Sequence, residues 1–111
     1  SCKITTYQIE EMLGTKLRAL YQRRKGRDLF DLYKALTSTK IETEKIIECY
    51  HRYIGFVVEK PPTKKEFLIN MDAKITSEEF LGDTNLLLRH DEVYQPQIAY
   101  EIVRTQLIEK L

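Results

Sequence analysis

The sequence predicts an all-α fold, a bundle of five to six helices that forms a single domain over residues 1–111. Apolar residues recur along most of the chain with the 3.6-residue spacing of an amphipathic helix, and strict alternation is almost absent. A length of 111 residues is typical of one domain. Purely apolar runs such as Leu86–Leu88 are far shorter than the roughly 20 residues that a membrane helix needs. We therefore expect no membrane-spanning segment.

The first half of the chain predicts three helices. The first spans residues 7–23, where Thr5 followed by Gln8 has the pattern of a capping box. Gly26 ends the following turn, and the second helix spans residues 28–38 with Asp28 at its start. The third helix spans residues 42–58 and carries on one side the apolar positions Ile46, Ile47, Tyr50, Tyr53, Ile54, Val57 and Val58.

The second half begins with Pro61 and Pro62, which interrupt the helical pattern. A fourth helix is expected over residues 63–74, with inward positions at Phe67, Leu68 and Met71. A shorter helix that carries Phe80 and Leu81 follows, and a further turn or helix is expected around Leu86–Leu88. The last helix follows Pro96, and its apolar positions are Ile98, Ala99, Ile102, Val103, Leu107 and Leu111.

The positive charge of the chain is concentrated in one short stretch. The net charge is only +1, yet residues 16–27 contain six basic side chains and no acidic one. The other 99 residues carry 12 basic and 17 acidic side chains. Such a local excess indicates an anionic ligand, although a basic cluster is also typical of an ordinary solvated face.

The cysteine and histidine residues predict neither a metal site nor nucleophilic catalysis. Cys2 and Cys49 have no CxxC spacing and form no disulfide framework, which favours a reducing cytoplasm. His51 and His90 have no Ser, Cys or second His at catalytic or metal-binding spacing. The four glycines are scattered, so the sequence contains no glycine-rich phosphate loop.

Lys16 occupies an unusual position in the first predicted helix. If each residue turns the helix by about 100° from Ile9, Leu20 lies near 20° and Lys16 near −20°, inside the apolar stripe. Arg23 follows near −40°, whereas Arg18 points to the far side by the same arithmetic. Burying an ammonium without an anion costs free energy. Lys16 therefore either extends its ammonium to water or lines a cleft and faces a phosphate or carboxylate.

Asp28 and Asp31 are three residues apart, on neighbouring positions of one helix face. An acid at the N-cap with another in the first turn starts a helix well, so both have a structural explanation. In a simple antiparallel hairpin, Lys16 would lie about 10 Å before the turn and Asp31 about 5 Å after it. We therefore expect no direct salt bridge between Lys16 and either aspartate, although all three can face one ligand.

The stretch TKLRALYQRRKGRDLFDLY, residues 15–33, resembles the third and fourth motifs of the AbiEii family of nucleotidyltransferase-like toxins. These are the toxins of abortive-infection, type IV toxin–antitoxin pairs. The family pattern is a Lys-Leu-x-Ala-Leu helix, a basic turn and Arg-Asp-x-x-Asp. Residues 16–20 read KLRAL and residues 27–31 read RDLFD, in agreement with it. The remaining helical sequence is similar as well.

The resemblance implies a polymerase-β-like nucleotidyltransferase domain followed by a helical bundle. The first motif of the family is a Gly-Ser turn leading to Asp-x-Asp, which holds magnesium, and this sequence contains neither. The resemblance thus implies that the chain is the helical C-terminal part of such a protein, without its N-terminal catalytic sheet. Mg²⁺ is then expected only for the full-length enzyme, with no metal site and no cofactor in this chain.

The resemblance also implies site residues and partners. Lys16 lines the nucleotide cleft and neutralises phosphate charge that develops during transfer, while Asp28 and Asp31 complete its polar wall. Which aspartate is catalytic and which caps the helix stays open. The phosphates of NTP or RNA are expected to contact Arg23, Arg24, Lys25 and Arg27. The implied partners are NTP, an acceptor such as tRNA, and a cognate antitoxin protein.

Two other functions remain open from the residues alone. One is a stand-alone helical module that binds a partner protein through apolar grooves and has no catalytic activity. The other is a small RNA-binding domain that acts through the basic turn, with Tyr21 available for base stacking.

Overall fold

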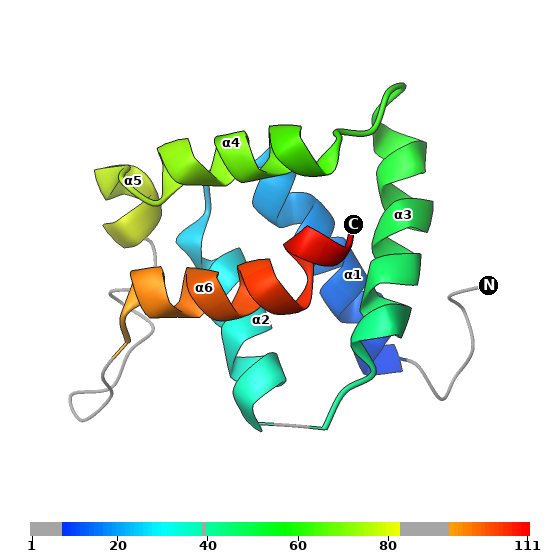
Figure 1. Cartoon of the computed structure of the whole chain (residues 1–111), viewed down its shortest axis with the longest axis horizontal. Coiled ribbons are helices and arrows are strands. Elements are labelled where there is room, and N and C mark those ends of the chain that lie inside the picture. Colours follow the sequence, from blue (N-terminus) through cyan, green and yellow to red (C-terminus); the bar gives the residue numbers. More distant parts are fainter. Residues whose placement is uncertain (1–7, 39, 83–93) are drawn as a thin grey trace.

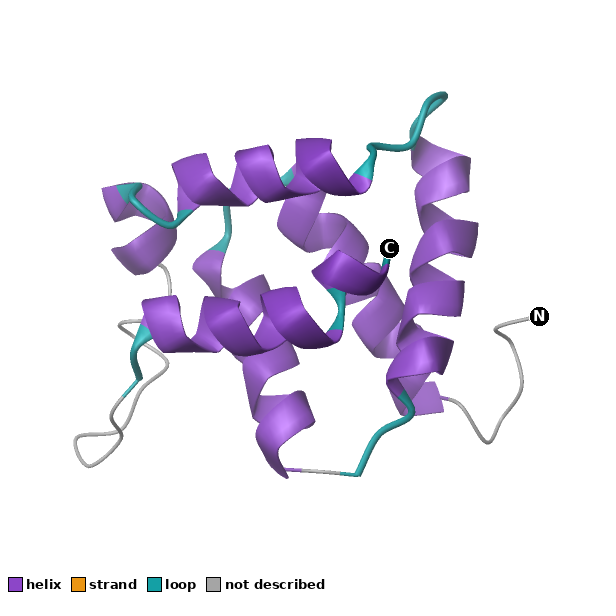
Figure 2. Ribbon diagram, viewed as in Figure 1, coloured by secondary structure: helices purple, strands orange, loops and turns teal. Residues whose placement is uncertain are grey.

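Most of the chain that the structure describes is helical. The computed structural model describes residues 8–38, 40–82 and 94–111. Within these ranges lie six α-helices, one short 3-10 helix and no strand (Figure 2). The elements are α1 (Gln8–Gln22), α2 (Gly26–Ser38), α3 (Thr43–Val57), α4 (Lys64–Lys74), α5 (Glu78–Gly82), α6 (Pro96–Gln106) and η2 (Ile108–Lys110) (Figure 1). The predicted all-α class is confirmed.

Helix α1 has neighbours on several sides. It packs against α2, α3 and α4, while α6 packs against α2 and η2 packs against α4. Figure 1 shows α4 running across the top of the bundle from the side of α3 to α5, with α6 below it. The first and last helices therefore belong to one bundle. None of the described helices is long and apolar enough to cross a membrane.

One apolar core joins these helices. α1 contributes three fully buried leucines and α2 contributes two, each worth about 1.5–3 kcal/mol of hydrophobic free energy on burial. The core side chains are Leu13, Leu17, Leu20, Leu29, Leu32, Ile46, Tyr50, Ile54, Phe67, Met71, Phe80, Ala99, Tyr100, Val103, Leu107 and Ile108. Most predicted inward positions are confirmed, because helical periodicity reports which face of each helix is apolar.

Four predicted apolar positions are exposed instead. Ile9 and Met12 are 38% and 49% exposed, because the buried face of α1, which carries Glu10, Leu13 and Leu17, is rotated away from them. Val57 is 49% exposed, since the buried positions of α3 end one turn earlier. Ile98 is 53% exposed, because α6 turns the opposite face, with Ala99 and Val103, to the core.

The observed helix ends agree with the predicted ends within a few residues. The difference that matters for the site is at α2, which begins at Gly26, two residues before the predicted start, so Asp28 lies inside its first turn. α4 begins with a capping box, in which Thr63 and Glu66 exchange hydrogen bonds of 2.9 and 3.1 Å. The predicted capping box at Thr5 and the predicted turn at Leu86–Leu88 lie outside the described residues.

Candidate functional site

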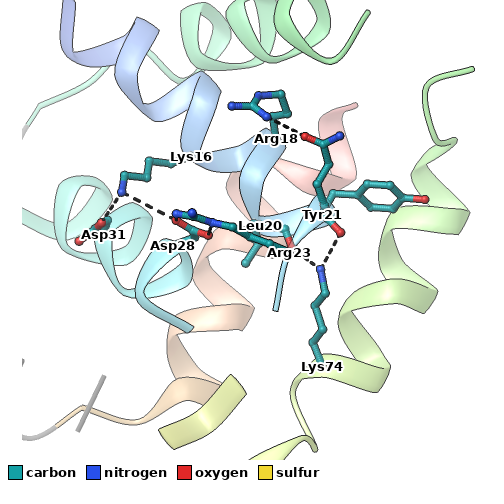
Figure 3. A network of polar contacts seen from close by, with 9 residues as sticks. Lys16, Arg18, Leu20, Tyr21, Arg23, Asp28, Asp31 and Lys74 are labelled. Carbon is teal, nitrogen blue, oxygen red and sulfur yellow. Dashed lines mark hydrogen bonds and ion pairs between the residues drawn. The ribbon is translucent and has the colours of Figure 1, made fainter. Parts of the chain in front are cut away.

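Four charged side chains from α1, α2 and the turn between them form one ion-pair cluster. Lys16 Nζ lies 2.9 Å from Asp31 Oδ2 and 3.8 Å from Asp28 Oδ1 (Figure 3). Arg23 donates two hydrogen bonds to Asp28, from Nε to Oδ2 at 2.9 Å and from Nη2 to Oδ1 at 3.0 Å. The structure thus brings together Lys16, Asp28, Asp31 and Arg23, all of which the sequence had indicated as site residues.

The prediction that Lys16 makes no direct salt bridge to these aspartates is wrong. It treated the two helices as a straight antiparallel hairpin and took the lysine side chain as leaning away from the turn. In the structure the first turns of α2 lie beside the middle of α1, and the four-carbon stem of Lys16 extends toward Asp31 (Figure 3). The apolar-stripe position of Lys16 therefore places its ammonium at the boundary of α1 and α2, with the side chain 27% exposed.

Asp28 and Asp31 differ sharply in exposure. The side chain of Asp28 is fully buried, whereas that of Asp31 is 37% exposed. Burying a carboxylate is tolerated only where it is paired, and the bidentate bonds from Arg23 supply that pairing. Asp28 also lies in the first turn of α2, where the helix dipole favours a negative charge. Asp31 is the carboxylate of this pair that a ligand can reach.

A hollow of about 250 Å³ lies beside the cluster on α1. The described residues that line it are Thr15, Lys16, Arg18, Ala19, Gln22 and Arg23, so three are cations and none is acidic. Arg18, which sequence reasoning placed on the far side and left out of the site, donates a 2.7 Å hydrogen bond to Gln22. This lining suits an anion such as a phosphate.

The other predicted phosphate-binding residues do not line this hollow. Arg24 and Lys25 are exposed in the turn after α1, and Arg27 is exposed in the first turn of α2. The ring of Tyr21 packs on Phe67, with the ring centroids 5.2 Å apart. Tyr21 therefore contributes to the core rim, and the suggestion that it stacks a base gains no support from its position.

Sequence reasoning missed Lys74, the last residue of α4. Its side chain is 5% exposed, and Nζ donates hydrogen bonds to the backbone carbonyl oxygens of Leu20 and Tyr21 at 2.5 and 2.6 Å (Figure 3). Burial lowers the pKa of Lys74 to about 8; the nearby Arg24 charge adds to the lowering and Asp28 opposes it. No local pattern could have revealed this residue, because its partners lie more than 50 positions away.

The lowered pKa of Lys74 predicts a rise in stability with pH. Between about pH 8 and pH 10.5 the unfolded chain holds a proton that native Lys74 has released, so the free energy of unfolding increases with pH there. We expect a gain of about 2 kcal/mol between pH 8 and pH 10. Urea denaturation across this range should show the rise in the wild type and its loss in Lys74→Met.

Buried tyrosines set the upper pH limit of this rise in stability. Burial raises the pKa of Tyr50 to about 12 and also raises the pKa values of Tyr94 and Tyr100. Above about pH 10 the native state therefore holds tyrosine protons that the unfolded chain loses, and stability falls. A fall in stability between pH 8 and pH 10, or an equal rise in Lys74→Met, would contradict the prediction.

The described residues do not form a magnesium site. No group of three His, Cys, Asp or Glu side chains gathers anywhere in the described ranges. The two neighbouring carboxylates, Asp28 and Asp31, are both paired with cations, and a metal ion would have to displace Arg23 or Lys16. We therefore derive no step through a metal from these residues.

Comparison with known proteins identifies the family. The family model for the nucleotidyl transferase AbiEii toxin of type IV toxin–antitoxin systems matches residues 1–99. The chain belongs to this family, which supports a toxin role of the nucleotidyltransferase type and a partnership with an antitoxin. The matched segment contains the whole ion-pair cluster. A search of curated proteins and a search of solved structures each found no match.

Proposed function

We propose that the protein transfers a nucleotide from NTP to an acceptor such as tRNA, and that this chain contributes Lys16, Asp28 and Asp31 to the cleft. The observation that supports this most strongly is the cluster itself. A lysine from the apolar stripe of α1 is held by two carboxylates at the rim of a hollow lined by cations. A purely structural ion pair needs neither the partial exposure of Lys16 nor the adjoining hollow.

Lys16 is the proposed catalytic cation. Its ammonium is partly shielded from water, so its attraction to a negative charge is stronger than that of a fully solvated lysine. A phosphate bound in the hollow would lie next to this ammonium, which would neutralise the charge that develops on phosphate oxygens during transfer. Asp31 would orient the ammonium through their 2.9 Å ion pair.

The remaining charged residues are proposed to position Lys16 and to bind phosphate. Asp28 is buried and would hold both Lys16 and Arg23 in place without contacting the substrate. Arg23, whose side chain is 51% exposed and lines the hollow, would also contact a phosphate oxygen. Further phosphates of a triphosphate or an RNA backbone would contact Arg24, Lys25 and Arg27.

The proposal extends to magnesium and to the partners of the full-length protein. Transfer from NTP in the full-length enzyme is proposed to use Mg²⁺ bound by residues outside this cluster. A cognate antitoxin is the proposed protein partner, in an abortive-infection response, because the family consists of toxins from toxin–antitoxin systems. The cytoplasm is the proposed location, since NTP and tRNA are both present there.

The proposal predicts that Lys16→Ala abolishes transfer with little loss of stability. The rate should fall by about 100-fold or more, because a preorganised charge next to the phosphate is lost. Stability should fall by at most about 1 kcal/mol, because Lys16 is partly exposed and Asp28 keeps its two bonds from Arg23. The assay incubates the full-length protein with each α-labelled NTP and total tRNA, and measures label incorporated into RNA.

Lys60→Ala is the matched control, since it removes one exposed lysine far along the chain. It should leave transfer within about twofold, the change expected of a surface charge. Lys16→Ala that retained full transfer would show that the ion pair serves only to join α1 and α2. Absence of transfer by the wild type, together with binding of a partner protein, would favour the helical interaction module.

A further inference from the structure

Lys74 is a buried charged residue that the proposed mechanism does not use. It ends α4, and its ammonium contacts the last turn of α1 rather than any acidic side chain within salt-bridge distance among the described residues. Its Nζ lies 5.9 Å from the centroid of the Tyr21 ring. Burial of an ammonium costs free energy, so the contacts that Lys74 makes in the interior call for a specific explanation.

The two carbonyls that Lys74 binds are those that would extend α1. In a continued α-helix the Leu20 carbonyl would accept from the backbone N–H of Arg24, and the Tyr21 carbonyl from that of Lys25. The backbone N–H of Arg23 still donates to the Ala19 carbonyl at 2.9 Å, so the helical hydrogen bonds stop just after it. Lys74 therefore occupies the positions at which the next helical bonds would form.

The residues after this point have little reason of their own to leave the helix. Arginine and lysine are good helix formers, and a positive charge at a helix C-terminus is favourable. If α1 extended through Lys25, the tight turn before Gly26 could not form in its present shape. Arg23 could then no longer place both of its donors on Asp28, which lies in the first turn of α2.

We propose that Lys74 is a positioning residue that ends α1 at Gln22 and thereby directs Arg23 toward both Asp28 and the cationic hollow. α4 thus takes part in building a site to which it contributes no lining residue. This inference rests on the proposed function insofar as the hollow is taken to bind phosphate. It adds that the anion-binding geometry depends on an ammonium from a helix far along the chain.

The charge of Lys74 matters in addition to its hydrogen bonds. Three charged or titratable groups among the described residues face Lys74. They are Tyr21 of α1, Arg24 of the turn after α1, and Asp28 of α2. Charge-assisted hydrogen bonds are about twice as strong as neutral ones, so deprotonation weakens the hold on the two carbonyls. Because the pKa of Lys74 is lowered to about 8, that change takes place in an accessible pH range.

The experiment measures sulfate binding and backbone conformation in the full-length protein by NMR. Sodium sulfate, which does not titrate in this range, is compared with sodium chloride at equal ionic strength. Its affinity is followed through the Arg23 side-chain signals, and the Cα chemical shifts of Arg24 and Lys25 report whether α1 has extended. The variants are Lys74→Met, which removes the charge, Lys74→Arg, which keeps it, and Lys64→Met, which removes an exposed lysine at the other end of α4.

We expect Lys74→Met to weaken sulfate binding at least about fivefold and to shift Arg24 and Lys25 toward helical values. Lys74→Arg and Lys64→Met should stay within about twofold of the wild type. If Lys74→Met does not fold, the wild type itself provides the test. Between about pH 7 and pH 9 its sulfate affinity should fall through the titration of Lys74, and that of Lys74→Arg should stay level.

The outcomes separate this inference from the proposed function. Unchanged affinity and unchanged Cα shifts in Lys74→Met would overturn the positioning role while leaving the hollow as an anion site. Sulfate affinity that falls equally with pH in the wild type and in Lys74→Arg would overturn it as well. Absence of any specific sulfate binding by the wild type would overturn both the anion site and the inference built on it.

Discussion

Replacing Arg23 with alanine is expected to lower the free energy of unfolding by about 3–5 kcal/mol. Arg23 supplies both hydrogen bonds to the carboxylate of Asp28, whose side chain has no exposed surface. Without Arg23, the ion pair that the described residues still offer to the buried charge is the one with Lys16, at 3.8 Å. A buried carboxylate without an adequate partner is far more costly than a lost surface ion pair. Urea or thermal denaturation of the purified variant measures the effect.

Arg24→Ala is the matched control for this prediction. Arg24 is the next residue and is also exposed, so this substitution removes the same charge from the chain. It should change the free energy of unfolding by less than about 0.5 kcal/mol. The double variant Arg23→Ala, Asp28→Ala should be less destabilised than the sum of the two single changes. Strict additivity, or equal effects of Arg23→Ala and Arg24→Ala, would show that the bidentate pair does not stabilise the fold.

A second large effect is expected from Gly14→Ala, at the crossing of α1 and α3. A Cβ at residue 14 would lie 2.6 Å from Cβ of Cys49 and 3.0 Å from the backbone N of Tyr50. The Tyr50 backbone atom cannot rotate away, so the helices must separate. We expect a loss of about 2–3 kcal/mol, because overpacking outweighs the gain of about 1 kcal/mol in helix propensity. Chemical denaturation with far-UV circular dichroism is a suitable measurement.

Gly55 offers the opposite case within the same fold. A Cβ at this position meets nothing within 4 Å, and the residue lies inside α3. Gly55→Ala should therefore stabilise the protein by about 0.5–1 kcal/mol through helix propensity alone. A stabilising Gly14→Ala, with an effect like that of Gly55→Ala, would contradict the close crossing of α1 and α3.

The structural and phosphate-binding roles proposed for Arg23 are compatible. Its Nε and one terminal nitrogen donate to Asp28, while the side chain as a whole is 51% exposed and borders the hollow. A guanidinium has five N–H donors in a planar arrangement, so it can bind a buried carboxylate on one edge and an anion on another. Lysine at this position could not reproduce the planar bidentate contact with Asp28.

The sequence by itself determined the helices, most of the core positions and the location of the charged cluster. Apolar spacing is a local property, so the faces that carry Leu13, Ile46 and Phe67 could be predicted before any helix was packed. The basic stretch and its two aspartates likewise indicated where the charged cluster lies. The motif around Lys16 also indicated the AbiEii family, which the match over residues 1–99 now establishes.

Only the tertiary structure decided how the charged groups pair. The contact of Lys16 with Asp31 depends on the crossing of α1 and α2, and a straight hairpin predicted the opposite. The burial of Asp28 and Lys74 depends on helices from distant parts of the chain, as does the exposure of Ile98. Periodicity describes one helix at a time, whereas burial and ion pairing are set by which neighbour covers each face and at what angle.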